Sequence, residues 1–301
     1  MPSPLVTIII PTYNRLPVIC RAVDSALSQS YSNIECIVID DFSSDATLST
    51  LSEKYVDRIT VLRNDKNRDK SYTRNKGINS ANGEYICFLD SDDELTKDSV
   101  EERVNIFLSD PSFDGVVFGL RQDSTSSSAK VLKSCKFHTG DLLTLDSYLD
   151  NSILLSTNSF LMTKANMLKY GMYNETINNK EDIELFLRLL TSLPFKFCGT
   201  IVTIVHQDAD NRARNDSELF LAQERKFTDI ISANRQLMVK LGPRFGDIQR
   251  KEHDEVLRAL YHAGKGKMFR QVYAEGWSNK MSNRSFKFLK RYFLSYFKFK
   301  S

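Results

Sequence analysis

The segment Tyr85-Ile-Cys-Phe-Leu-Asp-Ser-Asp-Asp93 joins a short apolar run to a dense acidic cluster. An apolar run of this length, followed directly by polar residues, is typical of a strand buried on both faces of a sheet. Two earlier runs, Leu5–Ile10 and Ile34–Ile39, have the same character. The first is rich in β-branched residues and ends at a proline, and the second ends at a pair of aspartates. We therefore expect three buried strands with polar carboxyl ends in the first third of the chain.

Helical patterns separate these strands. Apolar residues recur at helical spacing over Pro17–Gln29, and Ser44 or Asp45 has the side chain of an N-cap for the next helix. A further strand over Ile59–Leu62 precedes a helix around Tyr72–Asn79. Strands that alternate with helices in this way predict an α/β fold, with a parallel sheet and helices on both of its faces.

The pattern loosens after residue 93. The elements expected there are a helix over Thr96–Phe107, a strand over Phe113–Leu120, a polar loop over Asp123–Ser128, a helix over Glu181–Leu190 and an apolar strand over Phe195–Val205. A charged segment, 208–216, follows, and the remainder has helical patterns over Leu219–Leu241 and Asp247–Glu275. We therefore expect a domain boundary near residue 206 and a mainly helical region over 206–301.

Composition excludes several classes of protein. The 301 residues are 41% hydrophobic, which is enough to bury a sizeable core, and this excludes intrinsic disorder. The chain has 41 basic and 38 acidic residues, a net charge of +3, which argues against a nucleic-acid partner. Its five cysteines are odd in number and widely spaced, without a Cys-x-x-Cys pair. Neither a disulfide framework nor a zinc site is expected, and Cys36 and Cys87 should be buried.

The expected location is the cytoplasm. The cysteine usage suits a reducing compartment. The apolar run Leu5–Ile10 lacks a basic segment before it and is too short for a signal peptide. No apolar stretch approaches the roughly 18–20 residues that span a bilayer.

The acidic strand ends predict a site for a divalent cation. In open α/β sheets, ligands bind beyond the carboxyl ends of the parallel strands. Carboxylates gathered there repel one another unless a cation lies among them, and hard oxygen ligands favour Mg²⁺ or Mn²⁺. The glycine-rich phosphate-binding motifs are absent, so a metal and basic side chains would hold any phosphate. The alternative is that each aspartate is a turn or capping residue, which is the commoner role of a single one.

These residues, together with others, resemble the family 2 glycosyltransferases of the bacterial polysaccharide-biosynthesis type. The motifs that carry the resemblance are Val6-Thr-Ile-Ile-Ile-Pro-Thr-Tyr-Asn-Arg15, Val38-Ile-Asp-Asp-Phe-Ser-Ser-Asp45, Thr73-Arg-Asn-Lys-Gly-Ile78, Ala81-Asn-Gly-Glu-Tyr-Ile86, Phe88-Leu-Asp-Ser-Asp-Asp93, Tyr170-Gly-Met-Tyr-Asn-Glu175 and Glu181-Asp182 with Arg188. They occur in the family's order over about residues 5–205.

The resemblance implies the GT-A fold, a Rossmann-like, mostly parallel sheet flanked by helices, with a helical C-terminal extension. The implied catalytic domain is 1–205, with a nucleotide-sugar half over about 1–93 and an acceptor half over about 94–205. Three positions depart from the family's common residues: Phe42 and Asp69 stand where glycine is frequent, and Thr73 where alanine is frequent. These departures concern the loops on the donor side.

The resemblance also implies transfer of a sugar from a nucleotide diphosphate to a hydroxyl, with inversion at the anomeric carbon. The implied nucleotide-sugar site comprises Pro11, Thr12, Tyr13, Asn14, Arg15, Asp41, Arg74, Asp90 and Ser91. Asp41 would accept a hydrogen bond from the imide N–H of a uracil base, which favours a UDP-sugar. Asp92 would bind the metal, Mn²⁺ or Mg²⁺, and Asp93 would assist it. Arg74 would meet the diphosphate, unless it is a plain surface arginine.

An inverting transfer needs one base to accept the proton of the acceptor hydroxyl. By resemblance this base is Asp182, with Glu181 and Arg188 in support. The alternative is that the two acidic residues only complement the dipole at the start of a helix. His206 follows the last strand and is either a further site residue or a structural histidine.

The C-terminal tail, 280–301, has seven basic residues and no acidic one. Within it, 284–300 interleaves aromatic and basic residues so that a helix would have an aromatic stripe between positive flanks. Such a helix is typical of a membrane-surface element, which would place the protein peripherally on the inner face of the cell membrane. This location suits a glycan or lipid-linked acceptor. The alternative is a helix that docks on the catalytic domain or on another subunit of a homo-oligomer.

Two other functions are compatible with acidic strand ends. A metal-dependent nucleotidyltransferase would also place carboxylates there, but it is expected to have a glycine-rich phosphate loop near the N-terminus. A non-catalytic nucleotide-sugar-binding protein would be expected to have lost Asp92 or Asp182, and both are present.

Overall fold

The computed structural model describes residues 3–206, 217–278, 290–292 and 294–295. The chain divides into two compact units, Met1–Asp210 and Asn211–Ser301. The predicted boundary near residue 206 lies just before this division.

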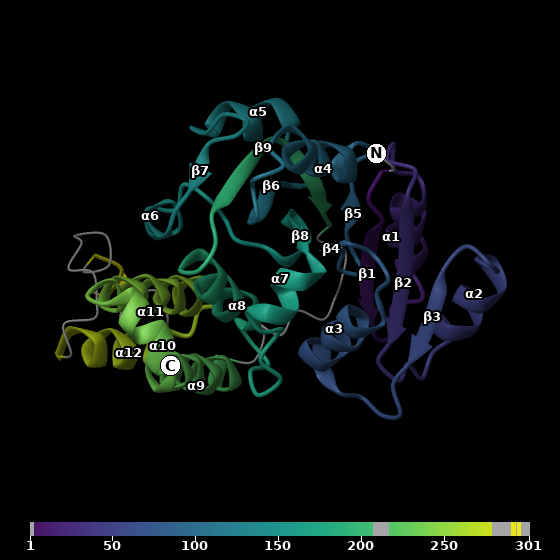
Figure 1. The fold of residues 1–301 in the computed structure, drawn as a ribbon. Coiled ribbons are helices and arrows are strands. Elements are labelled where there is room, and N and C mark those ends of the chain that lie inside the picture. The colour runs from purple at the N-terminus through teal and green to yellow at the C-terminus, as the bar shows by residue number, and fades with distance from the viewer. Residues whose placement is uncertain (1–2, 207–216, 279–289, 293, 296–301) are drawn as a thin grey trace. The chain divides into compact units, whose positions relative to one another are not determined.

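Four parallel strands form the first half of the sheet in the first unit, in the order β3-β2-β1-β4 (Figure 1). Their bounds are β1 Val6–Thr12, β2 Ile34–Asp40, β3 Thr60–Arg63 and β4 Tyr85–Phe88. The apolar runs predicted these strands to within two residues at each end. Thr12 lies opposite Asp40 in the register of β1 and β2, so the polar residues that follow the two strands meet at one edge.

The second half of the sheet is mixed. Its strands are β5 Glu94–Leu95, β6 Val116–Asp123, β7 Leu142–Leu143, β8 Phe160–Thr163 and β9 Phe195–Val205. β8 lies antiparallel between β4 and β6, whereas β6 and β9 are parallel. β5 and β7 pair antiparallel with β9. The predicted α/β class is confirmed, and the parallel pairing is interrupted where β8 joins the two halves.

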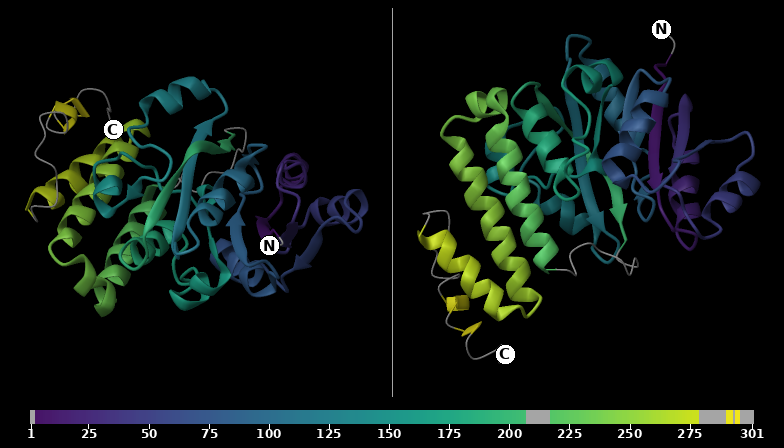
Figure 2. Two further views of the ribbon diagram at one scale, coloured as in Figure 1. Left: turned by 45° about the horizontal axis from the view of Figure 1, so that its top comes forward. Right: turned by 90° about the horizontal axis from the view of Figure 1, so that it is seen from below.

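Helices lie on both faces of this sheet (Figures 1 and 2). They are α1 Ile19–Leu27, α2 Thr47–Lys54, α3 Asp69–Ser80, α4 Ser99–Ser109, α5 Ser128–Ser134, α6 Leu145–Leu149, α7 Lys164–Lys169 and α8 Glu181–Leu190, with a 3₁₀ turn, η1, at Thr157–Ser159. The predictions for α8 and β9 agree with the structure at both ends.

The predicted N-cap of α2 and the predicted start of β6 were wrong. The N-cap of α2 is Ala46, not Ser44 or Asp45, although the Asp45 carboxylate accepts a hydrogen bond from the Thr47 amide at 3.0 Å. The strand expected from Phe113 begins at Val116, because the Phe113 amide donates to the Asp110 carbonyl in a turn.

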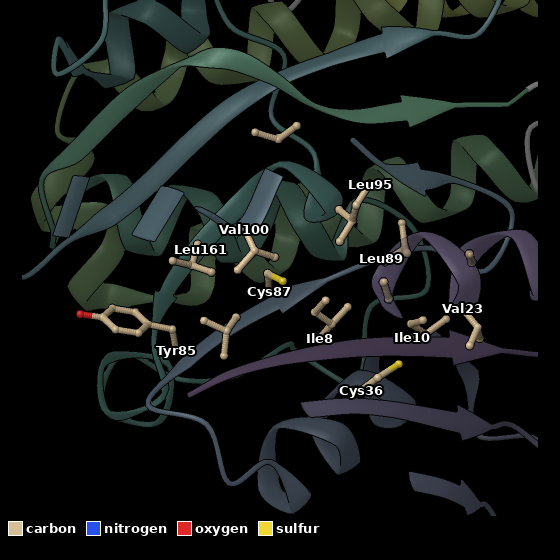
Figure 3. Packing of buried hydrophobic residues seen from close by; sticks show 14 of the residues in the cluster. Ile8, Ile10, Val23, Cys36, Tyr85, Cys87, Leu89, Leu95, Val100 and Leu161 are labelled. Carbon is tan, nitrogen blue, oxygen red and sulfur yellow. The ribbon is translucent and has the colours of Figure 1, made fainter. Parts of the chain in front are cut away.

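The core of the first half is built from alternate residues of the parallel strands. Ile8 and Ile10 of β1 pack with Val23 of α1 in a cluster that also contains Cys36 and Cys87 (Figure 3). The predicted burial of both cysteines is confirmed. Burial of these side chains removes apolar surface from water, which stabilises the folded state by about 25 cal/mol for each Å² buried.

The opposite face of β1 is covered by α3, and a glycine allows the approach. A Cβ atom on Gly77 would lie 2.4 Å from the Cγ2 atom of Ile9 and 2.9 Å from the Cδ1 atom of Ile39. Both isoleucines are buried, so neither can move aside cheaply. Gly77 therefore fixes how closely α3 lies to the sheet.

The second unit is helical, as predicted. Its helices are α9 Ser217–Ala233, α10 Arg235–Leu241, α11 Arg244–His262 and α12 Gly266–Ser278 (Figure 2). The pattern read as one helix to residue 241 is interrupted at Asn234, whose side chain accepts a hydrogen bond from the Leu237 amide and caps α10. Val256, Leu260 and Phe269 belong to its apolar core.

The predicted amphipathic tail, 284–300, lies outside the described residues except for 290–292 and 294–295. Within the part of the chain that the structure describes, no helix has both the length and the apolar character to cross a bilayer.

We expect Gly77→Ala to lower the free energy of unfolding by about 1–3 kcal/mol, because the added methyl group overpacks the interface of α3 with the sheet. Chemical denaturation of the full chain measures this change. Gly246→Ala is the matched control, because Gly246 is also helical and an added Cβ atom would meet only the Arg250 side chain, at 3.6 Å. A loss of stability in Gly246→Ala as large as in Gly77→Ala would contradict the packing argument.

Candidate active site

The loops that follow β1 and β2 are joined by hydrogen bonds. The Asp41 amide donates to the Thr12 carbonyl at 2.8 Å. The Asn14 amide donates to Ser43 Oγ at 2.9 Å, and the Asn14 side chain accepts from the Ser44 amide at 2.8 Å. Asn14 has a φ of 51°, in the left-handed region that asparagine tolerates better than most residues. Asn14 therefore organises the two loops that flank the predicted nucleotide site.

The two aspartates after β2 lie in different surroundings. The Asp40 carboxylate is fully buried, accepts from the Ser43 amide and pairs with Arg63 at 3.3 Å. Oδ1 of Asp41 accepts from Asn64 Nδ2 at 2.7 Å and from the Arg68 amide at 2.8 Å. Asp40 thus holds its own turn, whereas Asp41 is fixed by groups from the β3–α3 connection.

Two of the three departures from the family's common residues occupy the left-handed region of the backbone. Phe42 has a φ of 68° and Asp69 a φ of 65°, where glycine alone carries no steric penalty. Each has a contact that glycine would lack: the Phe42 ring lies 4.8 Å from the Arg63 guanidinium, and Asp69 accepts from Asn178 Nδ2 at 3.0 Å. These side-chain contacts compensate in part for the strained conformation.

The remaining loop residues offer groups to a ligand. The Tyr13 ring is 46% exposed. Thr12 is buried, and no hydrogen-bond partner lies within reach of its hydroxyl. Pro11 is half-buried and Ser91 is buried beside the acidic cluster. Arg15 lies 3.7 Å from Asp92, which links the loop after β1 to the end of β4.

Asp93 is tied into the protein by both of its carboxyl oxygens. Oδ2 accepts from Asn158 Nδ2 at 2.7 Å, and Oδ1 accepts from the His206 amide at 3.1 Å. The Asn158 side chain also accepts from the Asp90 amide at 3.0 Å. Burial, reinforced by the charges of Asp90 and Asp92, raises the pKa of Asp93 to about 8. Asp93 therefore holds this end of the sheet together, and its assistance to a metal stays a prediction.

Asp90 and Asp92 are the carboxylates that reach the surface of this cluster, with side chains 38% and 24% exposed. Across residues 3–206 and 217–278, no three His, Cys, Asp or Glu side chains gather closely enough to hold a metal by themselves. Mg²⁺ commonly takes one or two carboxylates and completes its shell with phosphate oxygens and water. The residues present fit a cation of that kind, which would be shared with a bound diphosphate.

His206 lies at the same end of the sheet. Its Nε2 atom is 3.0 Å from a Glu94 carboxylate oxygen, which is also 3.3 Å from Arg21 Nε. Arg21 donates in turn to the Asp92 carbonyl at 2.6 Å. The structure thus brings His206 to the acidic cluster, beside the ion pair of Arg21 with Glu94.

Arg74 is not a surface residue, so that alternative was wrong. Its side chain is 5% exposed, and its two Nη atoms donate to Asp90 and to Glu181, each at 2.9 Å. The guanidinium lies 5.2 Å from the centre of the Tyr173 ring. A direct contact with the diphosphate stays a prediction. The structure shows instead that Arg74 connects the end of β4 to the start of α8.

Asp182 lies next to this connection, in the first turn of α8. It is half-buried, and its Oδ1 accepts from the Ile183 amide at 2.9 Å. Burial and the charge of Glu181 raise the pKa of Asp182 to about 6, against the opposing effect of Lys70 and Arg74. A carboxylate with a pKa nearer to neutrality is a better general base than an ordinary one. The site therefore combines a cluster of aspartates at the end of β4 with a carboxylate, Asp182, whose raised pKa suits a general base.

Arg188 fixes the loop that precedes Tyr173. It donates to both oxygens of Glu184 and to the carbonyls of Tyr170, Gly171 and Met172, all at 2.7–2.8 Å. The next residue, Tyr173, exchanges two backbone hydrogen bonds of 2.9 Å with the Asn75 side chain. These bonds hold the 170–175 motif against α3.

Sequence reasoning missed Lys70, Asn158 and Asn64. Lys70 is four residues before Arg74, and this spacing places both on one face of α3, a signal that could have been found. Asn158 and Asn64 lie in segments without a pattern that marks them, so only the three-dimensional structure identifies them.

Residues 7–172 match the model of glycosyl transferase family 2. The chain belongs to this family. As a family 2 glycosyltransferase it is an enzyme, and the nucleotidyltransferase and non-catalytic alternatives are set aside.

Curated relatives agree with this membership. The chain is 32% identical over 193 residues to the putative teichuronic acid biosynthesis glycosyltransferase TuaG of Bacillus subtilis. The aligned region covers 62% of this chain and 73% of that protein. It is 30% identical over 200 residues to the chondroitin synthase of Escherichia coli, covering 66% of this chain but 28% of that protein.

The fold also has solved counterparts. The structure of S. aureus TarS residues 1–349 in complex with UDP-GlcNAc matches with a TM-score of 0.65 over 97% of this chain and 90% of that chain. The sequence identity is 18%, so this match shows the fold alone. The GT-A fold expected from the sequence motifs is confirmed.

We expect Arg74→Met to lower the free energy of unfolding by about 3–5 kcal/mol, because it leaves the buried Glu181 carboxylate and Asp90 without their shared cation. Urea denaturation measures this loss. Arg68→Met is the control, because Arg68 makes an exposed ion pair with Asp65 and should leave the stability nearly unchanged. Equal effects of the two variants would contradict a central role for the Arg74 bridge.

Proposed function

We propose that this glycosyltransferase moves a sugar from a UDP-sugar to a hydroxyl of a glycan or lipid-linked oligosaccharide, with inversion at the anomeric carbon. The observation that carries the proposal is the placement of Asp182, which lies beside a buried network, Glu181–Arg74–Asp90, that reaches the acidic end of β4. The proposed base would lie at the Glu181 end of this network and the proposed diphosphate site at its Asp90 end. An arrangement with the base and the leaving group on different sides suits a direct displacement.

The donor side of the proposal is supported by the loops after β1 and β2. The fixed carboxylate of Asp41 suits the imide N–H of uracil, and the exposed Tyr13 ring offers a face to the base. The solved relative TarS was crystallised with UDP-GlcNAc, which supports a UDP-sugar as the donor class. The names of TuaG and chondroitin synthase support a polysaccharide product.

The proposed chemistry is a single displacement. Asp182 accepts the proton of the acceptor hydroxyl while the hydroxyl oxygen bonds to the anomeric carbon from the face opposite the diphosphate. The bond from that carbon to the diphosphate oxygen breaks, and UDP leaves. A divalent cation held by Asp92, with Asp90 adjacent, would neutralise charge on the diphosphate. Arg74 keeps Asp90 and Glu181 in place during the reaction.

The proposed base predicts a pH profile. We expect the rate of UDP release with a saturating donor and acceptor to fall as the pH is lowered through about 6, because protonated Asp182 cannot accept the hydroxyl proton. Asp182→Asn should lower kcat by about 10²–10⁴-fold and leave UDP binding intact. Titration calorimetry checks the binding. Asp229→Asn, which alters an exposed carboxyl group of α9, is the control. Loss of UDP binding in Asp182→Asn would contradict the role of a base.

The proposed cation predicts metal-dependent donor binding. We expect one member of a panel of UDP-sugars to raise the melting temperature with Mn²⁺ present and not after a chelator is added. Asp92→Asn should abolish this increase, whereas Glu53→Gln, which alters an exposed residue of α2, should retain it. Equal stabilisation of wild type and Asp92→Asn by the same sugar and Mn²⁺ would exclude Asp92 as the ligand.

A further inference from the structure

One buried carboxylate oxygen is shared by two cations of α3. Oε1 of Glu181 lies 2.8 Å from Lys70 Nζ and 2.9 Å from Arg74 Nη1. The Glu181 side chain is 3% exposed, whereas that of Lys70 is 44% exposed. Lys70 and Arg74 are four residues apart, so both project from the same face of the helix toward α8. A surface lysine therefore completes the neutralisation of a buried acid.

Arg74 and Lys70 differ in what else they hold. Arg74 also donates to Asp90 and lies over the Tyr173 ring, so its loss would disturb the donor side. Among the described residues, Lys70 forms its ion pair with Glu181. Because Lys70 is partly in water, its replacement leaves no cavity in the core. Lys70 is thus the cation whose charge can be removed without dismantling the site.

Asp182 follows Glu181 directly, and its protonation depends on the charge at Glu181. Among the described residues, the charged groups that act most strongly on Asp182 are Glu181 on α8 and Lys70 and Arg74 on α3, and Asp182 in turn acts on the Tyr173 hydroxyl. The negative charge of Glu181 favours the protonated form of Asp182, and the two cations favour the ionised form. The balance between these groups decides whether Asp182 can act as a base near neutral pH.

We propose that Lys70 is a positioning residue that keeps Asp182 ionised at neutral pH by neutralising Glu181. The catalytic consequence of this inference rests on the proposed role of Asp182 as the base. The electrostatic part does not, because it concerns the free protein. Loss of the Lys70 charge would leave the Glu181 carboxylate with Arg74 alone, and that cation is already shared with Asp90.

The direct test is a titration of Asp182 in the donor-free protein. The carboxyl resonance of Asp182 is followed by NMR with ¹³C-labelled aspartate and is assigned from its absence in Asp182→Asn. We expect Lys70→Met to move the titration midpoint upward and Glu181→Gln to move it downward, each by roughly one pH unit. Opposite movements distinguish an electrostatic role from a general loss of structure, which would not give shifts of opposite sign.

Two controls accompany the titration. Lys70→Arg keeps the charge and should restore the wild-type midpoint. Lys66→Met removes an exposed lysine in the connection before α3 and should leave the midpoint unchanged. An unchanged midpoint in Lys70→Met, or an equal upward movement in Lys66→Met, would overturn the inference. If Glu181→Gln does not fold, Lys70→Met with its two controls still decides the question.

Activity then separates this inference from the proposed function. In Lys70→Met, the acid limb of the pH profile of kcat should move to higher pH, together with the titration midpoint of Asp182 found by NMR. A midpoint that moves while the acid limb stays in place would uphold the effect of Lys70 on Asp182 and would refute Asp182 as the base. A melting temperature close to that of the wild type confirms that the Lys70 variants are folded.

Discussion

The site depends on one buried cation. The Arg74 guanidinium lies beneath the surface and joins Asp90, at the end of β4, to Glu181, at the start of α8. A buried charge is tolerated only when opposite charges and hydrogen bonds surround it, so the two acids and the cation constrain one another. Because the acids come from elements about 90 residues apart in sequence, this single side chain sets the separation of the donor region and the proposed base.

Polar side chains that bond to backbone groups extend this constraint. Asn75 holds the Tyr173 backbone, Arg188 holds three carbonyls of the preceding loop, and Asn158 holds the Asp93 side chain and the Asp90 amide. Buried polar groups must be satisfied, so each of these bonds fixes an irregular segment that has no ladder of its own. The motifs recognised in the sequence therefore include residues that arrange the site as well as residues that face a ligand.

Much of the fold could be predicted because its signals are local. The buried strands β1, β2 and β4 are continuous apolar runs, and α8 and β9 have sharp polar borders. The antiparallel insertion of β8 between β4 and β6 could not be predicted, because pairing partners are chosen by packing between segments distant in sequence. The predicted N-cap of α2 was wrong for a similar reason: the Asp45 carboxylate also accepts a hydrogen bond from the Leu16 amide at 3.3 Å, a residue distant in sequence.

The sequence by itself determined the α/β class and the acidic strand ends, since both depend on the order and type of neighbouring residues, and its resemblance to the family 2 glycosyltransferases supplied the candidate base. Tertiary structure alone decided which groups meet. It placed Arg74 in the interior between two acids, gave Asp93 a structural role, and put Lys70 against Glu181. The physical reason is that charges in a protein interior interact strongly over a few ångströms, and such distances are set by the packing of helices on the sheet.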